Sequence, residues 1–353
     1  MENKKVLIGM SGGVDSSVAA YLMLQNGFSC IGTTMSLCDG LPDVSPMDSR
    51  DAATVAQRLG IPFCTMDACA AFRKEVVGPF VQAYENGLTP NPCILCNKHL
   101  KFRAMLHKAL ELGCDGIATG HYAIIKKDET TGRYLLYKAA DKQKDQSYFL
   151  ACLDQEQLSR SYFPLGGFTK EEIREIAETQ GFVTARKKDS QDICFIPDGD
   201  YVSFIRKYTG KDYPQGAYLD LEGNVVGQHQ GAISYTIGQR RGLGIAMGEP
   251  VYVCSKDMQA NSVTIGPDET LFHTTLLAKN WNWIAIPELT VPTEVDAKVR
   301  YRHQPQKATV YPEENGVCRV VFKEAQRAIT PGQAVVLYQE DSVVGSGTIC
   351  EVL

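Results

Sequence analysis

The octapeptide Met10-Ser11-Gly12-Gly13-Val14-Asp15-Ser16-Ser17 sets the fold of the first half of the chain. It follows the apolar residues 6–9, which predict a buried parallel strand, and precedes residues 18–24, whose helical composition ends at Gly27. A strand, a Ser/Gly loop and a helix start thus come in direct succession. Because glycines reach positive φ, such a loop turns sharply, and its amides and the helix N-terminus then face an anion. The octapeptide therefore predicts a phosphate-binding loop.

The loop lacks the Walker pattern, since no Gly-Lys-Ser/Thr closes it. Ser-Gly-Gly-Val-Asp-Ser-Ser resembles instead the pyrophosphate loop (PP-loop) of the ATP pyrophosphatase superfamily. The members of that superfamily split ATP between the α and β phosphates and adenylate a carbonyl or carboxyl group. An ordinary glycine-rich turn is the alternative, but the whole heptapeptide directly after a strand favours ATP binding.

Bulk properties narrow the class of protein. The chain has 353 residues of average globular composition, so we expect two or three domains. A net charge of −5 argues against uniform electrostatic binding of nucleic acid but leaves room for a local basic face. Residues 6–10 are too short for a signal peptide and no stretch can span a bilayer, so we expect a cytoplasmic protein with no membrane partner. Its twelve cysteines are then mostly reduced.

Strands alternate with helices over the first 85 residues. We expect strands at 30–35 and 61–66 and helices at 49–59 and 71–84. This alternation predicts a doubly wound parallel sheet, which binds its ligand at the carboxyl edge of its strands. The Ser/Gly loop lies at that edge.

The segment from residue 89 to residue 179 is more varied. Two prolines in residues 89–98 predict an extended path without a helix, and a helix follows from about 100 to 112. Residues 116–122 predict a short strand and a glycine turn, and residues 123–138 predict a hairpin. The capping box at 169–172 predicts a helix to about residue 179.

Beyond about residue 208 long helical patterns stop and short alternating runs punctuated by glycines take over. Residues 276–353 are almost purely β in pattern, which predicts a small antiparallel barrel or sandwich. The predicted fold is therefore α/β: a doubly wound PP-loop domain at 1–204, a small central domain at 205–271 and a C-terminal antiparallel β-barrel domain at 272–353.

Further motifs point to one family. They occur in order: Thr-Pro-Asn-Pro-x-x-x-Cys-Asn-Lys from Thr89, Ala-Thr-Gly-His-Tyr from Ala118, Lys-Asp-Gln-Ser-Tyr-Phe-Leu from Lys144, Ile-Cys-Phe-Ile from Ile193, Ser-Tyr-Thr-Ile-Gly-Gln-Arg-Arg-Gly-Leu-Gly from Ser234, Val-Arg-Tyr-Arg from Val299 and Thr-Pro-Gly-Gln from Thr330. With the loop, they resemble the tRNA-specific 2-thiouridylases from Lys5 to the end of the chain. The resemblance implies that ATP activates the C2 carbonyl of the wobble uridine, that sulfur from a protein persulfide replaces its oxygen, and that AMP and pyrophosphate are released. It also implies that the central domain binds tRNA.

This chemistry needs an α-phosphate site, because a uracil oxygen leaves only after adenylation. The loop amides with Ser11, Ser16 and Ser17, together with Mg²⁺, are suited to stabilise the phosphate charge, while Asp15 either holds the metal or orients the loop. The resemblance implies an ATP site formed by Gly9, Met10, Ser11, Gly12, Gly13, Val14, Asp15, Ser16, Ser17, Met35 and Gly120. Without the family, Met35 is interpreted as a core residue and Gly120 as a turn glycine.

The sulfur step needs thiols. The resemblance implies that Cys194 carries the persulfide and that Cys96 is the partner nucleophile, leaving a transient Cys96–Cys194 disulfide that must be reduced in each turnover. Lys98 and His99 are close in sequence and could lower a thiol pKa. Each cysteine alone would be interpreted as a buried apolar residue.

Cys93 departs from the family, which usually has an acidic residue there. A Cys-x-x-Cys with Cys96 could resolve the persulfide without Cys194. Alternatively Cys93, Cys96 and Cys194 could hold a [4Fe–4S] cluster, or zinc with His99. A neutral exchange at a tolerant position is the remaining alternative.

Four separate basic runs in an acidic chain favour a basic groove for tRNA. They include Lys138, Lys142 and Lys144, then Lys187 and Lys188, then Arg240 and Arg241, and finally Lys298, Arg300, Arg302, His303 and Lys307. The resemblance implies contacts with the target base or the tRNA by Asn91, Pro92, Cys93, His121, Lys144, Asp145, Gln146, Arg300, Tyr301 and Gln333.

The partners that the resemblance implies are tRNAs for Lys, Glu and Gln and a cysteine desulfurase or sulfur-relay protein. Another PP-loop adenylating ligase is the competing enzyme class, and it would need neither paired cysteines nor a basic β domain. A non-catalytic tRNA-binding or sulfur-carrier protein is the other alternative, which the intact loop disfavours.

Overall fold

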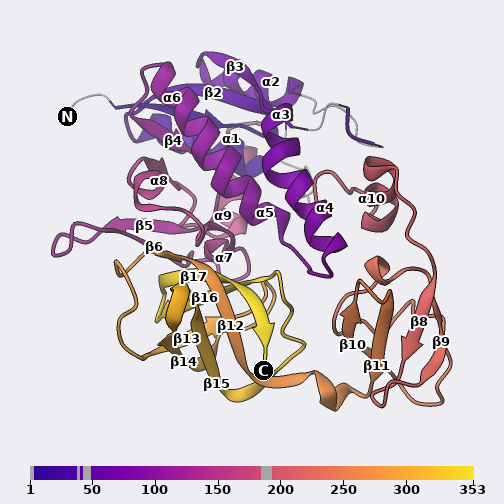
Figure 1. The fold of residues 1–353 in the computed structure, drawn as a ribbon. Coiled ribbons are helices and arrows are strands. Elements are labelled where there is room, and N and C mark those ends of the chain that lie inside the picture. The colour runs from indigo at the N-terminus through magenta and orange to yellow at the C-terminus, as the bar shows by residue number, and fades with distance from the viewer. Residues whose placement is uncertain (1–3, 38–39, 43–48, 184–192) are drawn as a thin grey trace.

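The computed structural model describes residues 4–37, 40–42, 49–183 and 193–353. Figure 1 shows an α/β domain at the top, a β-barrel below it and a small β domain beside the barrel. The predicted fold class is confirmed. None of the helices in these parts of the chain is both long and apolar enough to cross a membrane.

The first sheet is parallel throughout. Its strands are β1 (Lys5–Gly9), β2 (Ser29–Ser36), β3 (Phe63–Asp67), β4 (Gly116–Ala118) and β7 (Ser161–Tyr162), in the order β3-β2-β1-β4-β7. From β1, the chain adds β2 and β3 on one side of the sheet and then β4 and β7 on the other side, so the strand order reverses between β1 and β4. In open α/β sheets, ligands bind at the carboxyl ends of the strands at such a switch point.

Helices cover both faces of this sheet, because alternate residues of β1 point to opposite sides. Val6 and Ile8 pack with α1 (Val14–Gln25), α2 (Arg50–Leu59) and α9 (Lys170–Thr179). Leu7 packs on the other side with residues of a long helical segment that follows Asn91. The capping box that starts α9 is present, with Thr169 and Glu172 bonded as predicted.

That long segment corrects one prediction. Residues 89–98 are not extended throughout, because α5 (Pro92–Cys96) begins inside them and continues through the π-helical η2 (Asn97–Ala104) into α6 (Met105–Glu111). Pro92 occupies the first helical position, where a missing N–H costs nothing and φ is already helical. Asn91 caps the helix by accepting the Cys93 N–H at 3.2 Å.

The remaining helical elements of the N-terminal half connect these layers. They are α3 (Cys69–Phe72), η1 (Arg73–Val77), α4 (Gly78–Glu85), α7 (Ser147–Leu150) and α8 (Gln155–Ser159). The predicted hairpin is also present as β5 (Ile124–Lys127) and β6 (Tyr134–Tyr137). The sequence did not indicate that β6 pairs with the barrel, where Tyr137 lies opposite Ser342.

The central domain is a four-stranded sheet with its own small core. After α10 (Tyr201–Thr209), the strands β8 (Gly216–Leu219), β9 (Val225–His229), β10 (Tyr252–Asp257) and β11 (Ser262–Gly266) assemble in the order β10-β11-β8-β9. Short 3₁₀ turns lie at η3 (Ala232–Ser234) and η4 (Asp268–Leu271). The predicted limit near residue 205 falls within α10, whose Phe204 and Ile205 pack against the α/β domain.

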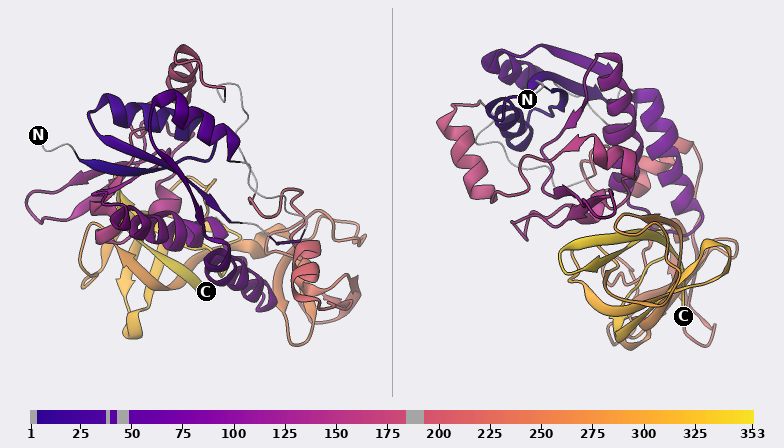
Figure 2. Two further views of the ribbon diagram at one scale, coloured as in Figure 1. Left: turned by 90° about the horizontal axis from the view of Figure 1, so that it is seen from above. Right: turned by 90° about the vertical axis from the view of Figure 1, so that its left-hand side faces the viewer.

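The C-terminal domain is a barrel and not an open sandwich (Figure 2). Its antiparallel strands are β12 (Phe272–Trp283), β13 (Thr293–Lys298), β14 (Gln306–Pro312), β15 (Cys318–Arg327), β16 (Ala334–Gln339) and β17 (Ser342–Val352), with η5 (Glu314–Gly316) before β15. They follow the order β12-β15-β14-β13-β16-β17, and β12 also pairs with β17, which closes the ring.

The barrel and the α/β domain share a core. Tyr148 and Leu150 of the α7 region cluster with Val336, Tyr338 and Val343 of the barrel. The Tyr148 hydroxyl donates to the Ala334 carbonyl at 2.9 Å. The two domains are therefore packed against each other, and the barrel can influence the position of segments in the α/β domain.

Candidate active site at the switch point of the parallel sheet

The Ser/Gly loop connects β1 to α1 and closes on its own hydroxyl groups. The Ser11 N–H donates to Ser16 Oγ at 3.2 Å, and the Gly13 carbonyl accepts from Ser16 Oγ at 3.1 Å and from Ser17 Oγ at 2.9 Å. Gly12 has φ +70°, and a Cβ there would lie 3.1 Å from the Asp51 side chain of α2. A glycine is thus required at this position by both conformation and space.

The residues that flank the loop fix it in the sheet. The Met10 N–H donates to the Thr33 carbonyl at 2.7 Å, which extends the pairing with β2. Gly9 ends β1, Val14 begins α1 as a buried residue, and Met35 lies half-buried near the end of β2 opposite Met66. The loop and Met35 therefore lie at the carboxyl edge of adjacent strands, as predicted.

Gly120 follows β4 and touches the start of α1. A Cβ on Gly120 would lie 2.7 Å from the Asp15 carbonyl carbon and 2.8 Å from the Ser16 nitrogen. Its φ is not in the left-handed region, so close packing and not turn geometry calls for glycine here. Whether Gly120 also contacts a nucleotide stays a prediction.

Asp15 is engaged in a network that the sequence did not reveal. The Lys170 ammonium lies 2.7 Å and 2.9 Å from its two carboxylate oxygens, and the Tyr122 hydroxyl donates to Oδ1 at 2.7 Å. Lys170 is the first residue of α9 and its side chain is only 5% exposed, against 30% for Asp15. Asp15 therefore ties α9 and the end of β4 to the loop, which corresponds to the orienting role.

The residues present fit Mg²⁺ only as a companion of ATP. In the parts of the chain that the structure describes, no group of three His, Cys, Asp or Glu side chains is arranged to hold a metal ion. Mg²⁺ commonly takes most of its ligands from phosphates and water, with one or two protein groups, and this arrangement allows that. The [4Fe–4S] and zinc alternatives need a set of ligands already in place, and the described residues show none, so both alternatives stay predictions.

Three cysteines nevertheless share one neighbourhood. Cys93 and Cys96 lie one turn apart on α5, with Cys93 exposed and Cys96 buried. Burial raises the pKa of Cys96 to about 11. Cys93 is exposed as a residue, but its thiol is still surrounded by enough protein that loss of solvation raises its pKa. The charge of a Cys194 thiolate raises the pKa of both further. Because its charge acts on both helix cysteines, Cys194 lies near α5 although 98 positions separate it from Cys96. Cys194 itself is exposed.

Aromatic packing positions the Cys194 segment. The ring of Phe195 meets those of Phe72 and Phe80 edge-on, with centroids 5.5 Å and 5.3 Å away. Phe195 and Ile196 are buried in the same cluster as Cys96. The apolar neighbours of Cys194 are therefore anchored on the helices beside α5, while Cys194 itself stays at the surface.

The cation that faces these thiols is Lys101. Its charge lowers the pKa of both Cys93 and Cys96, against the larger effect of burial. Lys98 and His99, the cations named from the sequence, are engaged elsewhere: Lys98 acts on the buried Cys152 and His99 lies 4.0 Å from Glu75. The π-helical segment explains this, because its hydrogen bonds join residues five apart and Lys101 is five residues after Cys96.

His121 lies just after β4, between Gly120 and the buried Tyr122. It follows Gly120 directly, its Nδ1 lies 2.7 Å from Thr119 Oγ1, and its ring centroid lies 5.5 Å from that of Phe102. Burial, with a smaller contribution from Lys101, lowers the pKa of His121 well below its usual value. His121 is therefore neutral at neutral pH, and Lys101 acts on both it and Cys96.

Several predicted tRNA contacts have structural partners in the protein. The buried Asp145 accepts from the Ala139 and Ser147 amides, and Gln146 Oε1 accepts the Tyr122 N–H at 2.9 Å. Gln333 Nε2 donates to the Thr89 carbonyl at 2.8 Å. These side chains shape the turns around the site, so their contacts with tRNA stay predictions.

The remaining tRNA candidates are spread over all three domains. Arg300 bonds to the Ala328 carbonyl and to Thr330 Oγ1, and Tyr301 packs on Phe149 with ring centroids 4.3 Å apart. Asn91 and Pro92 begin α5, and Lys144 is half-buried beside Asp145. Of the basic runs, Arg240 and Arg241 are exposed, while Lys187 and Lys188 lie outside the described residues.

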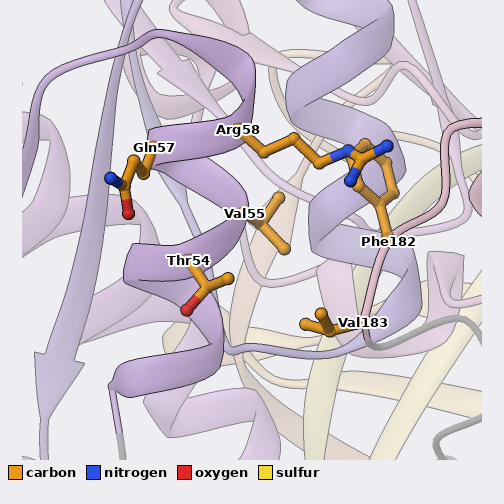
Figure 3. A pocket seen from close by; sticks show the side chains of 6 residues that line it. All are labelled: Thr54, Val55, Gln57, Arg58, Phe182 and Val183. Atoms are coloured by element: carbon orange, nitrogen blue, oxygen red, sulfur yellow. The ribbon is translucent and has the colours of Figure 1, made fainter.

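A small hollow elsewhere on the α/β domain does not belong to this site. It lies between α2 and the segment after α9 and is lined by Val55, Arg58, Phe182 and Val183, with Thr54 and Gln57 (Figure 3). No residue predicted to bind ATP or to carry sulfur lines it.

The fold and the site together define a class of protein. It is a PP-loop α/β protein with the Ser/Gly loop at the switch point of its parallel sheet, a group of cysteines on and near α5, and two β domains. Three family models match the chain in this order: a tRNA methyl transferase HUP domain at residues 4–198, a tRNA methyl transferase PRC-barrel domain at 202–267 and an aminomethyltransferase β-barrel domain at 273–349.

Relatives with a specific name match almost the whole chain. The tRNA-specific 2-thiouridylase MnmA of Clostridioides difficile (strain 630) is 47% identical over 98% of both chains, and that of Clostridium perfringens (strain 13 / Type A) is 48% identical over 99% of both. The chain belongs to the tRNA-specific 2-thiouridylase family. A solved 4-thiouridine synthetase–RNA complex with bound ATP is a distant likeness, with 19% identity over 58% of this chain and 50% of its own and a TM-score of 0.36.

Proposed function

We propose that this protein is a tRNA-uridine 2-sulfurtransferase, which uses ATP to replace the C2 oxygen of the wobble uridine with sulfur. The proposal rests on one observation: the Ser/Gly loop, which is expected to bind ATP, and the cysteines near α5 both lie close to the turn that follows β4. Gly120 touches the start of α1, where the Ser/Gly loop ends, and the charge of Lys101 acts on both the next residue, His121, and Cys96. A uridine between the loop and the thiols would meet both ATP and sulfur.

The first step is adenylation. The C2 oxygen of uracil attacks the α-phosphorus of ATP, and pyrophosphate leaves. The loop amides and the hydroxyl groups of Ser11, Ser16 and Ser17 stabilise the charge on the phosphates, and Mg²⁺ bound with ATP would neutralise part of it. Lys170 and Tyr122 hold Asp15 and thereby keep the start of α1 in place.

The second step is sulfur transfer. Because Cys194 is exposed, a cysteine desulfurase or relay protein can load it with a persulfide. The terminal sulfur attacks C2, AMP leaves, and the Cys96 thiolate then attacks the Cys194 sulfur. The bond between the Cys194 sulfur and the transferred sulfur breaks, and the transferred sulfur stays on C2 of the base. A Cys96–Cys194 disulfide forms. A dithiol reductant restores both thiols.

The test separates this proposal from its competitors. Purified protein is incubated with ATP, Mg²⁺ and unmodified tRNA for Lys, Glu or Gln, and AMP and pyrophosphate are measured with and without a persulfide donor. We expect both products to depend on tRNA with a uridine at the wobble position. ATP cleavage that instead depends on a small carboxylate or amide acceptor would favour another PP-loop ligase. Absence of any cleavage, with tRNA bound, would favour a non-catalytic binding protein.

A further inference from the structure

Cys93 and Cys96 have the geometry of a dithiol pair. They are three residues apart on α5, which begins at Pro92 and is capped by Asn91. In an α-helix this spacing puts the two Cα atoms about 5 Å apart on one face. That separation lies within the range of about 4.4–6.8 Å that a disulfide spans. Both are free thiols in this structure.

The two thiols differ in access. Cys96 is 7% exposed and lies in the cluster that contains Phe195, whereas Cys93 is exposed. Cys93 is therefore the more accessible of the two residues to a reductant in solution. Residues of α5 are also held from behind, since the Cys152 thiol donates to the Ile94 carbonyl at 3.4 Å.

We propose that Cys93 is the resolving thiol of the sulfur-transfer cycle. The inference rests on the proposed function, in which the Cys96–Cys194 disulfide is the product of each sulfur transfer. The Cys93 thiolate attacks the Cys96 sulfur, the bond between Cys96 and Cys194 breaks, and a Cys93–Cys96 disulfide forms. The Cys194 thiolate leaves and takes up a proton, so no net electrons are exchanged.

A dithiol reductant then completes the cycle. It attacks the Cys93 sulfur, gives two electrons and two protons to the Cys93–Cys96 disulfide, and becomes a disulfide itself. Cys194 is already able to accept the next persulfide while this reduction takes place. Reloading and reduction then occur at different sulfurs, which is an advantage over a cycle in which both must use Cys194.

A resolving role explains why a cysteine, and not an acid, stands at position 93. The family resemblance leads one to expect an acid, which could not take part in thiol–disulfide exchange. Cys194 acts electrostatically on Cys93 as well as on Cys96, and its neighbours Phe195 and Ile196 share a core cluster with Cys96, so the three cysteines lie in one neighbourhood. Burial raises the pKa of Cys93, and Lys101 offsets part of that rise and so favours the thiolate that attacks.

The experiment traps disulfides after one turnover. Wild-type protein and the variants Cys93→Ser, Cys93→Asp and Cys350→Ser are loaded with a persulfide, mixed with ATP and unmodified tRNA without reductant, and quenched with an alkylating agent. Peptide mapping then gives the disulfide pairs, and thiolated tRNA is measured in the same samples. Cys350, in β17 of the barrel, is the control for removal of a cysteine. Unchanged unfolding midpoints establish that the variants are folded.

We expect a Cys93–Cys96 disulfide in the wild type and in Cys350→Ser, and a Cys96–Cys194 disulfide in both Cys93 variants. With a limiting dithiol reductant, the steady-state rate of tRNA thiolation, divided by the yield of thiolated tRNA in the first turnover, should fall about tenfold in the Cys93 variants alone. Thiolated tRNA with Cys96–Cys194 as the wild-type end product would overturn the inference and leave the proposed function standing. Absence of thiolated tRNA from the wild type would overturn both.

Discussion

Lys170 is a lysine buried beside the ATP loop, and Asp15 is its counter-charge at 2.7 Å. Removing one partner of a buried ion pair leaves the other charge without compensation. We expect Lys170→Met to lower the free energy of unfolding by about 2–3 kcal/mol, less than for a fully buried pair because Asp15 is partly exposed. It should also raise the KM for ATP, because the start of α1 loses a support.

Lys108→Met is the matched control for this prediction. Lys108 pairs with Glu111 at 3.2 Å on the exposed face of α6, so its removal should cost less than about 1 kcal/mol. Denaturant unfolding monitored by fluorescence gives both values. Equal destabilisation of the two variants would show that the Asp15–Lys170 pair does not stabilise the loop.

The Cys96 thiol predicts a pH dependence with a definite sign. Burial raises its pKa to about 11, so the thiolate fraction rises about tenfold for each pH unit between 7 and 10. We expect alkylation of Cys96 in the free enzyme to accelerate accordingly. Lys101→Met removes a positive charge that favours the thiolate, so the pKa rises and alkylation at a fixed pH slows.

Mass spectrometry of the Cys96 peptide after timed alkylation measures this rate. The control is Cys152, which is buried and does not gain from Lys101. A rate that is independent of pH between 7 and 9 would contradict a raised pKa for Cys96.

For single residues, the sequence predicted local roles but did not predict which residues contact each other across the fold. The Ser/Gly loop could be predicted because strand, loop and helix are contiguous. Lys170 could not be assigned to Asp15, since 155 positions separate them and a lysine after a capping residue is usually exposed. Lys101 was missed because a regular α-helical period does not place it beside Cys96, whereas the π-helical segment does.

At the scale of elements, the turn of residues 330–333 holds the segment that leads into α5. The Thr89 N–H donates to the Pro331 carbonyl at 3.0 Å. The Gln333 side-chain amide in turn donates to the Thr89 carbonyl. Gly332 has φ +92°, and a Cβ there would lie 2.9 Å from the Leu88 side chain and the Thr89 nitrogen. The barrel therefore sets the path of the chain just before Cys93 and Cys96.

We expect Gly332→Ala to lower the rate of tRNA thiolation about tenfold, because Thr89 and the start of α5 are displaced. Gly316→Ala is the control, since Gly316 has φ +71° but no atom within 4 Å of the added Cβ. Both variants should lose about 1 kcal/mol of stability through backbone strain, but only Gly332→Ala should lose activity. Equal rates for the two would contradict the positioning role of this turn.

The element predictions failed where proline was treated only as a breaker of helices. Asn91 is extended, yet Pro92 starts a helix because its position is the first of the helix. The β5–β6 hairpin was predictable from its alternation, but its pairing with β17 was not, because strand pairing across domains leaves no local pattern in the sequence.

At the scale of the whole molecule, the net charge of −5 hides a local distribution of basic residues. Arg240 and Arg241 are exposed in the glycine loop of the central domain, whereas Lys307 is paired with Asp296 at 3.0 Å. Exposed arginines are available for phosphates, and a paired lysine is less so.

We expect the double substitution Arg240→Ala and Arg241→Ala to weaken tRNA binding and to lower the slope of log Kd against log salt by about 1–2. Lys307→Ala should change that slope by less than about 0.5 because Asp296 already neutralises it. Titrations of tRNA at several salt concentrations measure both. An unchanged slope in the double variant would place the tRNA elsewhere.

Domain classes could be predicted from the change in pattern along the chain, but domain docking could not. The contact of Tyr148 with the barrel strand β16 joins residues 186 positions apart. Such contacts depend on complementary surfaces, which composition and periodicity do not encode. The convergence of Cys194 on α5 was accordingly an expectation from the family and not from the residues.

The most direct test of the account follows labelled sulfur into tRNA. Anaerobically purified protein is incubated with ATP, Mg²⁺, unmodified tRNA and a desulfurase loaded with labelled sulfur, and label at the wobble uridine is measured for the wild type, Cys96→Ser and Cys194→Ser. We predict label at C2 of the wobble uridine with the wild type, and none above background with either variant. Label that still reaches the tRNA without Cys96 or without Cys194, or ATP cleavage without any label in wild-type reactions, would contradict the account.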